Sequence, residues 1–216
     1  MTAASPRPRS PSRPVPDRGQ ATRYRIIEQT ARLCTERHGA EVSVAEIAAA
    51  AGVFPNQVTY YFGSKDSLLV HAAFLALLHD VETVEPAGLQ ASDPAAFRRE
   101  IARAVLSLPS LPAVASALAA AIARPDLAPV VDKHLRLLFR QSERYLRRVV
   151  RERGWTLHRT PAAEARTFWS TTLGAVLLAR AGAACTAADL DLAGTLTIRD
   201  TRALSLGPSG IAAVLS

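Results

Sequence analysis

Apolar side chains recur along most of this chain with the three- to four-residue spacing of a helical face. In residues 21–37 they fall at Ile27, Ala31 and Cys34, the i, i+4, i+7 pattern of a single helix face. Alternation with the period of a strand occurs only weakly, in the sequence TLTIRD near the C-terminal end. The pattern predicts an all-α protein, with long helices over residues 94–106, 112–123, 127–153, 161–181 and 187–204.

Two short helices in tandem are predicted before the long ones. Ser43 and Glu46 have the spacing of a capping box, which begins a helix, and Gly52 supplies the turn that ends it. Pro55 suits the first position of the next helix, because the amide hydrogen that proline lacks would be unpaired there. Gly63 ends this second helix. A long apolar pattern follows, from residue 64 to the proline at 86.

The order of short helix, glycine turn and short helix is typical of a helix-turn-helix, whose second helix enters the major groove of DNA. With Val58 set inward, the rotation of about 100° per residue turns Asn56 and Tyr60 outward, with Gln57 and Thr59 on the flanks. This outward face is polar and uncharged, which suits contacts to base edges. From the spacing alone, a helix pair with only a structural role is an equal alternative.

The run SVAEIAAAAGVFPNQVTYYFGSKDSLL resembles the DNA-binding domain of the TetR/AcrR family of bacterial transcriptional regulators. The shared features are the Ala-Gly-Val turn, the aromatic pair before Phe62, and Ser-Lys-Asp followed by two leucines. The resemblance implies a dimer with a three-helix DNA-binding head and a larger helical ligand-binding body. It places base contacts at Phe54, Pro55, Asn56, Gln57 and Thr59 and phosphate contacts at Tyr60, Tyr61 and Lys65, to which Ser43 at a helix N-terminus is added.

Two positions depart from the family pattern. The small polar residue that usually opens the second short helix is Phe54, which cannot cap it. We therefore expect Asn56 or solvent to satisfy the free amides. The tyrosine that is usual three residues before Phe62 is Thr59. Both departures leave the operator sequence open, but not the mode of binding.

The predicted organisation has four parts: a tail at residues 1–19, a DNA-binding head at 20–66, an effector-binding and dimerisation body at 67–206, and a C-terminal tail at 207–216. The first tail is rich in proline, serine and arginine and is expected to be disordered. Its arginines could act as an arm in the minor groove of DNA. A solvated leader is the preferred interpretation, because chain termini are commonly disordered.

Composition excludes several classes of protein. A chain of 216 residues can bury a core without disulfide or metal staples, and its two cysteines, Cys34 and Cys185, leave too few ligands for a zinc site. The sequence contains no phosphate-binding loop and no catalytic serine or cysteine motif, so we expect no enzyme, no cofactor and no metal. The apolar stretch at residues 168–179 is too short to span a bilayer, and we expect a cytoplasmic protein.

The charge is less decisive. The net charge of +7 is compatible with binding nucleic acid but does not favour it over another anion. The predicted helix at residues 127–153 has many arginines on one side, and a solvated face with partners such as Glu143 and Glu152 is preferred over a second nucleic-acid surface. These arginines are Arg136, Arg140, Arg144, Arg147, Arg148 and Arg151.

The predicted helix at residues 161–181 has no charged side chain between residues 168 and 179, so more than one of its faces must be covered. This predicts a homodimer through Phe168, Thr172, Ala175, Val176 and Ala179. The family resemblance also implies a ligand cavity, although each candidate for its lining is individually more typical of an ordinary core. These candidates are Phe74, Phe97, His134, Phe139, Tyr145 and Trp169.

Together these features predict a transcriptional regulator: a repressor that leaves a near-palindromic operator DNA when a small molecule binds its body. One alternative keeps the DNA-binding head but places it under a protein partner or makes the protein an activator. A second alternative is a helical small-molecule-binding or enzymatic protein whose helix-turn-helix is only structural. Association with a membrane is least favoured, because the basic helix lacks exposed bulky apolar anchors.

Overall fold

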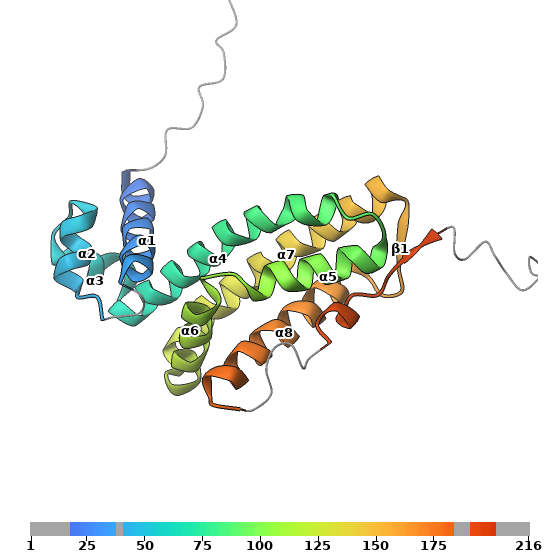
Figure 1. Ribbon diagram of the computed structural model, residues 1–216. Coiled ribbons are helices and arrows are strands. Elements are labelled where there is room, and N and C mark those ends of the chain that lie inside the picture. Colours follow the sequence, from blue (N-terminus) through green and yellow to red (C-terminus); the bar gives the residue numbers. More distant parts are fainter. Residues whose placement is uncertain (1–17, 38–40, 184–190, 202–216) are drawn as a thin grey trace, which may run out of the picture.

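The computed structural model describes residues 18–37, 41–183 and 191–201, which form eight α-helices, two short 3-10 turns and one pair of strands. Figure 1 shows the first three helices gathered at one end of an elongated molecule, and the other five forming a bundle. We call the first group the head and the second the body. Most of the N-terminal tail, the whole C-terminal tail and Cys185 lie outside the described residues.

The head consists of α1 (Arg18–Glu36), α2 (Val44–Ala51) and α3 (Pro55–Phe62). The predicted capping box is present at the start of α2. Ser43 Oγ accepts from the Glu46 amide at 3.2 Å, and the Glu46 carboxylate accepts from the Ser43 amide at 2.8 Å. Gly52 ends α2 with a φ of 62°, a left-handed conformation that glycine adopts without steric cost. Local sequence signals therefore set the boundaries of these helices.

The helix α4 (Lys65–Leu89) connects the head to the body. The side chain of Ser64 caps it by accepting from the Ser67 amide at 3.1 Å. Pro86, where the sequence predicted its end, lies inside the last turn. A proline removes one hydrogen bond, to the carbonyl four residues earlier, and so close to the helix end this loss does not prevent one more turn.

The body adds four helices whose ends lie within one residue of the predicted ones: α5 (Pro94–Leu106), α6 (Leu111–Ala123), α7 (Ala128–Arg153) and α8 (Pro161–Arg180). The side chains of Asp93 and Thr160 cap α5 and α8. The 3-10 turn η1 (Pro125–Leu127) leads into α7. The helix α4 packs against α5, α6 and α7, and α7 packs against α8, so α4 and α7 form the centre of the body (Figure 1).

The prediction of a final helix over residues 187–204 is wrong for the part that the structure describes. A 3-10 turn, η2 (Ala193–Thr195), leads there into strand β2 (Ile198–Asp200), which pairs antiparallel with β1 (Trp155–Leu157). Weak alternation in the TLTIRD sequence was the better signal, because Ile198 is fully buried whereas its neighbour in the strand is exposed. The capping box expected at Thr186 lies outside the described residues.

Glu164 on α8 anchors this C-terminal segment. Its side chain is completely buried and pairs with the Arg159 guanidinium, at 3.1 Å between Nε and Oε1. The same carboxylate accepts from the backbone amide of Thr197 at 3.0 Å. A buried carboxylate requires such partners, because burying an unpaired charge is costly. The segment before β2 is thus held on α8 by a side chain instead of forming its own helix.

Buried side chains form two hydrophobic clusters, one in the head and a larger one in the body. The helix α4 contributes Leu68 and Ala72 to the head cluster and Phe74 and Leu77 to the body cluster. Because a single helix belongs to both cores, a tilt of α4 within the body moves the head as well.

The helix α4 is also long and apolar enough to cross a membrane by length and composition alone. The apolar stretch judged too short for a membrane span, residues 168–179, lies in α8 and does not include this helix. Together, α5 and α6 meet the same criterion, but they are bent by 70°. The packing of α4 against α1, α5, α6 and α7 is that of the core helix of a globular fold.

Candidate nucleic-acid interface and body cavity

The outer face of α3 is open to solvent and has no charged side chain. On its inner side, Val58 and Phe62 are buried in the head cluster, as the predicted rotation of the helix requires. Phe54 is 76% exposed and Tyr60 is 82% exposed. The residues assigned to DNA contact that are exposed here are Phe54, Pro55, Asn56, Thr59 and Tyr60.

Gln57 has a structural role at the start of α3. Phe54 occupies the cap position, and its side chain has no oxygen that could accept from the first amides. Instead, Gln57 Oε1 accepts from the Phe54 amide at 3.0 Å. This bond pairs the amide of the cap residue itself, and no described side chain accepts from the first-turn amides, for which Asn56 or solvent was expected. Asn56 is exposed, whereas Gln57 can offer a base only the amino half of its side chain.

Two of the expected phosphate contacts are engaged inside the head. The Ser43 hydroxyl donates to the Glu46 carboxylate at 2.7 Å, so an acidic group already lies at the N-terminus of α2. Hydrogen bonds from Ser43, that of its backbone first, lower the pKa of Glu46 to about 2. Lys65 Nζ lies 2.8 Å from Glu41 Oε1 and lowers the pKa of that carboxyl group. At either position a phosphate must compete with a carboxylate.

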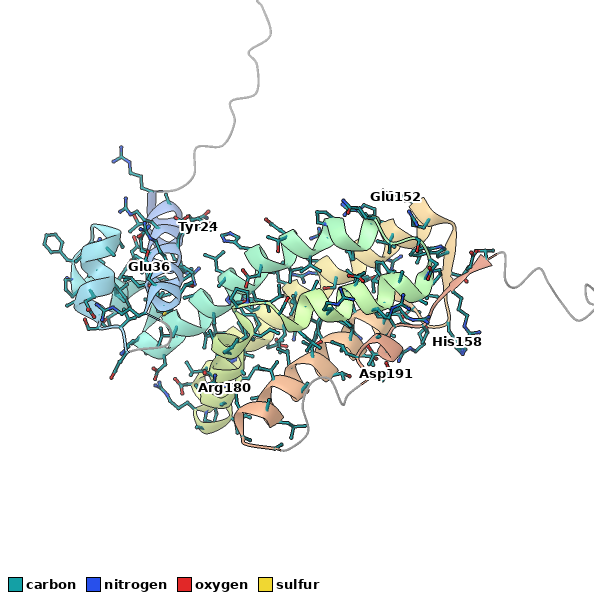
Figure 2. The ribbon with its side chains drawn as sticks, in the orientation of Figure 1. Tyr24, Glu36, Glu152, His158, Arg180 and Asp191 are labelled. Atoms are coloured by element: carbon teal, nitrogen blue, oxygen red, sulfur yellow. The ribbon has the colours of Figure 1, made fainter. Side chains whose placement is uncertain are left out.

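The tyrosines of α3 differ in their surroundings. Tyr61 is half-buried and packs against the head cluster, whereas Tyr60 projects from the helix. Their rings meet edge to face with centroids 5.2 Å apart, which supports the Tyr60 ring without using its hydroxyl. Tyr24 on α1 is a further exposed aromatic side chain of the head, and Figure 2 shows it projecting from that helix. Tyr24 is not among the residues predicted from the sequence to contact DNA.

A chain of hydrogen bonds crosses from the head to the body. Arg23 on α1 donates from Nη2 to His71 Nε2 on α4 at 2.9 Å. His71 Nδ1 lies 2.7 Å from Nε2 of His134 on α7. Because arginine can only donate, His71 has its proton on Nδ1 and donates it to His134. The chain joins one helix of the head to two helices of the body.

The two histidines of this hydrogen-bond series, His71 and His134, are neutral at pH 7. Burial is the first cause that lowers the pKa of His71 to about 3 and of His134 to about 4, and the positive charges of Arg23 and Lys133 act in the same direction. The His134 ring stacks on Phe74 with centroids 5.1 Å apart. The structure thus places His134, a candidate for the cavity lining, at the junction between head and body.

A cavity of about 340 Å³ lies in the body between α4, α5, α7 and α8. Tyr145 and Trp169, two of the six residues expected around a ligand, line it. Phe74 and Phe97 are fully buried core residues, and Phe139 packs against the same core without lining the cavity. Most of the cavity wall is apolar, and its polar side chains come mainly from α4 and α7.

The polar groups of the cavity are mostly paired. Trp169 Nε1 donates to Ser142 Oγ at 2.7 Å, and the Tyr145 hydroxyl donates to the Glu85 backbone carbonyl at 3.0 Å. Burial raises the pKa of Tyr145, so its hydroxyl stays protonated. Arg148 Nη2 lies 2.7 Å from Glu85 Oε2. Arg148 Nε is buried, and no acceptor among the described residues bonds to it.

Arg148 lines the cavity, although all the arginines of this part of α7 were predicted to lie on a solvated face. Arg136 and Arg147 fit that expectation, since they pair with Asp132 and Glu143 on the same helix. Arg148 lies three residues after Tyr145, however, and this spacing places both on the same side of a helix. That spacing was the available signal.

The surface expected to form a dimer needs correction. Phe168, Thr172 and Ala175 are buried within their own subunit, so they cannot present a surface to a second one. The lack of charge along residues 168–179 did not distinguish the face toward the core from the outer face. Val176 is half-buried and Ala179 is exposed, and these two remain accessible on α8.

Two protein families match separate parts of the chain. Residues 26–72 match bacterial regulatory proteins of the tetR family, and residues 94–197 match the C-terminal domain of bacterial transcriptional repressors. The first match covers the second half of α1, the helix-turn-helix and the start of α4, and the second covers most of the body. No match is found among the curated proteins.

Solved structures share this fold. A protein from Rhodococcus sp. RHA1, assigned as a transcriptional regulator, is 29% identical over 80% of this chain and 91% of its own, with a TM-score of 0.62. A protein from Mesorhizobium loti MAFF303099, assigned to the TetR family, is 15% identical over 83% and 93%, with a TM-score of 0.53. RolR in complex with resorcinol is 20% identical over 81% and 85%, with a TM-score of 0.55. The last two show a likeness of fold.

Proposed function

The chain belongs to the TetR family of bacterial regulatory proteins, and on this premise we propose that it is a homodimeric repressor released from its operator by a small molecule. The observation that supports this most is the arrangement along α4. The first turns of α4 pack in the head beside α3, and residues 78–85 line the body cavity. At 1.5 Å per residue, roughly 20 Å of a single helix separates the two sites.

In this function α3 lies in the major groove of operator DNA. Phe54, Pro55, Asn56, Gln57 and Thr59 read base edges, for which an amide bonds adenine and an apolar side chain contacts the thymine methyl group. The hydroxyl of Tyr60 is free to reach a phosphate, with Tyr61 behind it. Lys65 exchanges Glu41 for a phosphate, and at Ser43 the backbone of the α2 N-terminus makes the contact.

Two heads are needed for tight binding. In a dimer of helix-turn-helix proteins the recognition helices engage half-sites separated by one turn of DNA, ~34–36 Å, or a multiple of it. The cavity controls this separation through α4. A ligand that fits better when α4 is tilted favours a dimer whose heads no longer match the groove, and a tenfold loss of affinity needs a coupling of only ~1.4 kcal/mol.

The small-molecule part of the proposal is supported by the size and lining of the cavity. Ligand pockets are mostly apolar, with few polar groups and a volume of about 300–1,000 Å³. A protein of the same fold, RolR, holds resorcinol. The regulator acts on the chromosome and therefore in the cytoplasm, and its function includes no catalytic step.

The proposal is tested by selecting operator DNA from a randomised duplex library with the full chain. We expect enrichment of a near-palindrome. We also expect a loss of affinity of about tenfold or more for Asn56→Ala and Tyr60→Ala together, because a base contact such as that of Asn56 contributes ~1–3 kcal/mol and the double variant loses the phosphate contact of Tyr60 as well. Gln57 is left unchanged because it caps α3. The control is Ser116→Ala on the exposed side of α6. If the double variant folds and binds DNA like the parent chain, α3 is not the reading helix.

A further inference from the structure

Among the described residues that line the body cavity, one buried side-chain atom has no hydrogen-bond partner, and this atom indicates the chemistry of the ligand. We propose that the cavity takes an apolar molecule of one or two rings bearing a carboxylate or phenolate, which accepts a hydrogen bond from Arg148 Nε. This inference rests on the proposed function only in treating the cavity as the effector site.

The size of the cavity limits the ligand to a small ring system. A cavity of 150 Å³ engineered in another protein holds benzene, and the volume here is about 340 Å³. Phe168 and Trp169 form part of the wall with their rings edge to face, 5.8 Å between centroids. Aromatic rings pack well in this arrangement and in offset stacks. One or two fused rings therefore fit this wall.

The aromatic side chains offer this ligand no free polar group. The only donor of Trp169, its indole N–H, is bonded to Ser142. The Tyr145 hydroxyl is bonded to the Glu85 carbonyl. Glu82 and Arg144 also line the cavity, but both are exposed and retain their hydration. Gln141 and the Ser142 hydroxyl also line the cavity and can bond a polar ligand atom, but both are neutral. Arg148 is thus the positively charged group of this wall with a buried donor left for a ligand anion.

The Arg148 guanidinium is held in a fixed position. It lies over the Tyr145 ring, with its central carbon 5.6 Å from the ring centroid, and Nη2 pairs with Glu85. Its Nε remains buried with no acceptor among the described residues. An unsatisfied buried donor is unfavourable, and a guanidinium presents its donors in one plane that matches a carboxylate. A ligand acceptor that bonds Arg148 Nε therefore removes the free-energy cost of leaving this buried donor unpaired.

A cationic ligand finds no unpaired partner of opposite charge at this position. Glu85 is the nearest acidic side chain to Arg148 in the cavity wall, and it is already neutralised by that arginine. A ligand ammonium that took Glu85 would leave Arg148 half-buried and unpaired, which is strongly unfavourable. The sign of the ligand charge is thus the part of the proposal that is most readily tested.

The test uses two probes of equal shape and opposite charge, 2-naphthoate and 2-naphthylmethylammonium, titrated calorimetrically into the full chain. We expect 2-naphthoate to bind one site per chain at least about tenfold more tightly than the ammonium probe. Arg148→Met is expected to weaken 2-naphthoate by about tenfold or more, since hydrogen bonds to charged groups lie in that range. Arg151→Met is the matched control, an exposed arginine on the same helix outside the cavity.

A second variant tests the same contact independently, in case Arg148→Met does not fold. Glu85→Gln removes the competing carboxylate, so we expect 2-naphthoate to bind more tightly than to the parent chain. The proposal is overturned if the ammonium probe binds as tightly as 2-naphthoate, if Arg148→Met changes the affinity less than twofold, or if neither probe binds at millimolar concentration.

Operator binding measured on the same preparations separates this inference from the proposed function. If the chain binds selected operator DNA but not 2-naphthoate, the ligand class is wrong and the DNA-binding function stands. If it binds 2-naphthoate through Arg148 but enriches no operator, the cavity chemistry stands and the regulatory function fails.

Discussion

The head and the body use their functional side chains in opposite ways. On α3, most of the side chains proposed to contact DNA stand outside the core, with Tyr61 and Gln57 as the exceptions, and the buried residues are Val58 and Phe62. Around the body cavity, the side chains proposed to contact a ligand also hold the fold together, and Trp169 is only 2% exposed. Binding and stability are therefore separable in the head and coupled in the body.

The largest expected effect tests this separation directly. Trp169→Ala is expected to lower the free energy of unfolding by ~3–5 kcal/mol, because it leaves a cavity and removes the hydrogen bond to Ser142. Tyr60→Ala is expected to change it by at most ~0.5 kcal/mol, as for most exposed positions. Chemical denaturation measures both. Equal losses of unfolding free energy for the two variants would show that the exposed face of α3 also contributes to stability.

Acid is expected to weaken the junction between these regions. His71 is neutral in the folded protein, with a pKa of about 3, whereas an unfolded histidine has a pKa near 6.5. Below pH 6.5 the unfolded chain therefore binds a proton that the folded chain does not, and stability falls as the pH falls. At pH 5 the cost is ~2 kcal/mol for this residue, and His134 contributes in the same direction.

The measurement is the free energy of unfolding between pH 7 and pH 5, compared with that of His71→Gln. The variant is expected to lose part of the pH dependence. Glutamine keeps an acceptor for Arg23, so a loss of stability at pH 7 comes from the missing imidazole ring, which packs against Phe62 with centroids 5.6 Å apart. His79→Gln, at an exposed histidine on the same helix, is the control and should keep the full dependence. An identical pH dependence in all three chains would mean that the pKa of His71 is the same in the folded and the unfolded protein.

The head and the body also differ in how much of their structure the sequence could predict. The head is built from signals a few residues apart, such as Ser43 with Glu46, so its helices and the outward turn of Asn56 followed from spacing alone. The cavity joins residues about sixty positions apart, such as Glu85 with Arg148, and helical periodicity contains no information about which faces meet. For this reason Phe168, predicted for the dimer interface, lines the cavity beside Trp169, which was predicted there.

One glycine of the body and one of the head are expected to resist substitution by alanine for different reasons. A Cβ on Gly88 would overlap the Tyr145 hydroxyl and lie 2.8 Å from carbon atoms of Ile101 and Phe97, so Gly88→Ala is expected to cost ~1–3 kcal/mol through overpacking. In the head, a Cβ on Gly52 meets nothing within 4 Å, but its φ is 62°. Gly52→Ala is therefore expected to cost ~1–2 kcal/mol through backbone strain alone.

Second substitutions distinguish these two causes. Tyr145→Phe removes the overlapping hydroxyl and is expected to recover part of the Gly88→Ala loss in a double-mutant cycle. Gly52→Asn is expected to cost less than Gly52→Ala, because asparagine tolerates the left-handed conformation. If Tyr145→Phe gives no recovery, space around Gly88 is not what limits the body there.

The smallest effect concerns Ser43, where the head combines a structural and a proposed binding role. The Ser43 side chain accepts from the Glu46 amide and donates to the Glu46 carboxylate. Ser43→Ala is expected to cost ~1 kcal/mol of stability, as for other helix caps. Operator affinity, measured where both chains are fully folded, is expected to change less than about threefold, because the hydroxyl already has both of its partners within the head and the phosphate contact comes from the backbone. A tenfold loss of affinity with unchanged stability would instead assign the hydroxyl itself to the phosphate, and the separation between binding and stability would then extend from α3 to the start of α2.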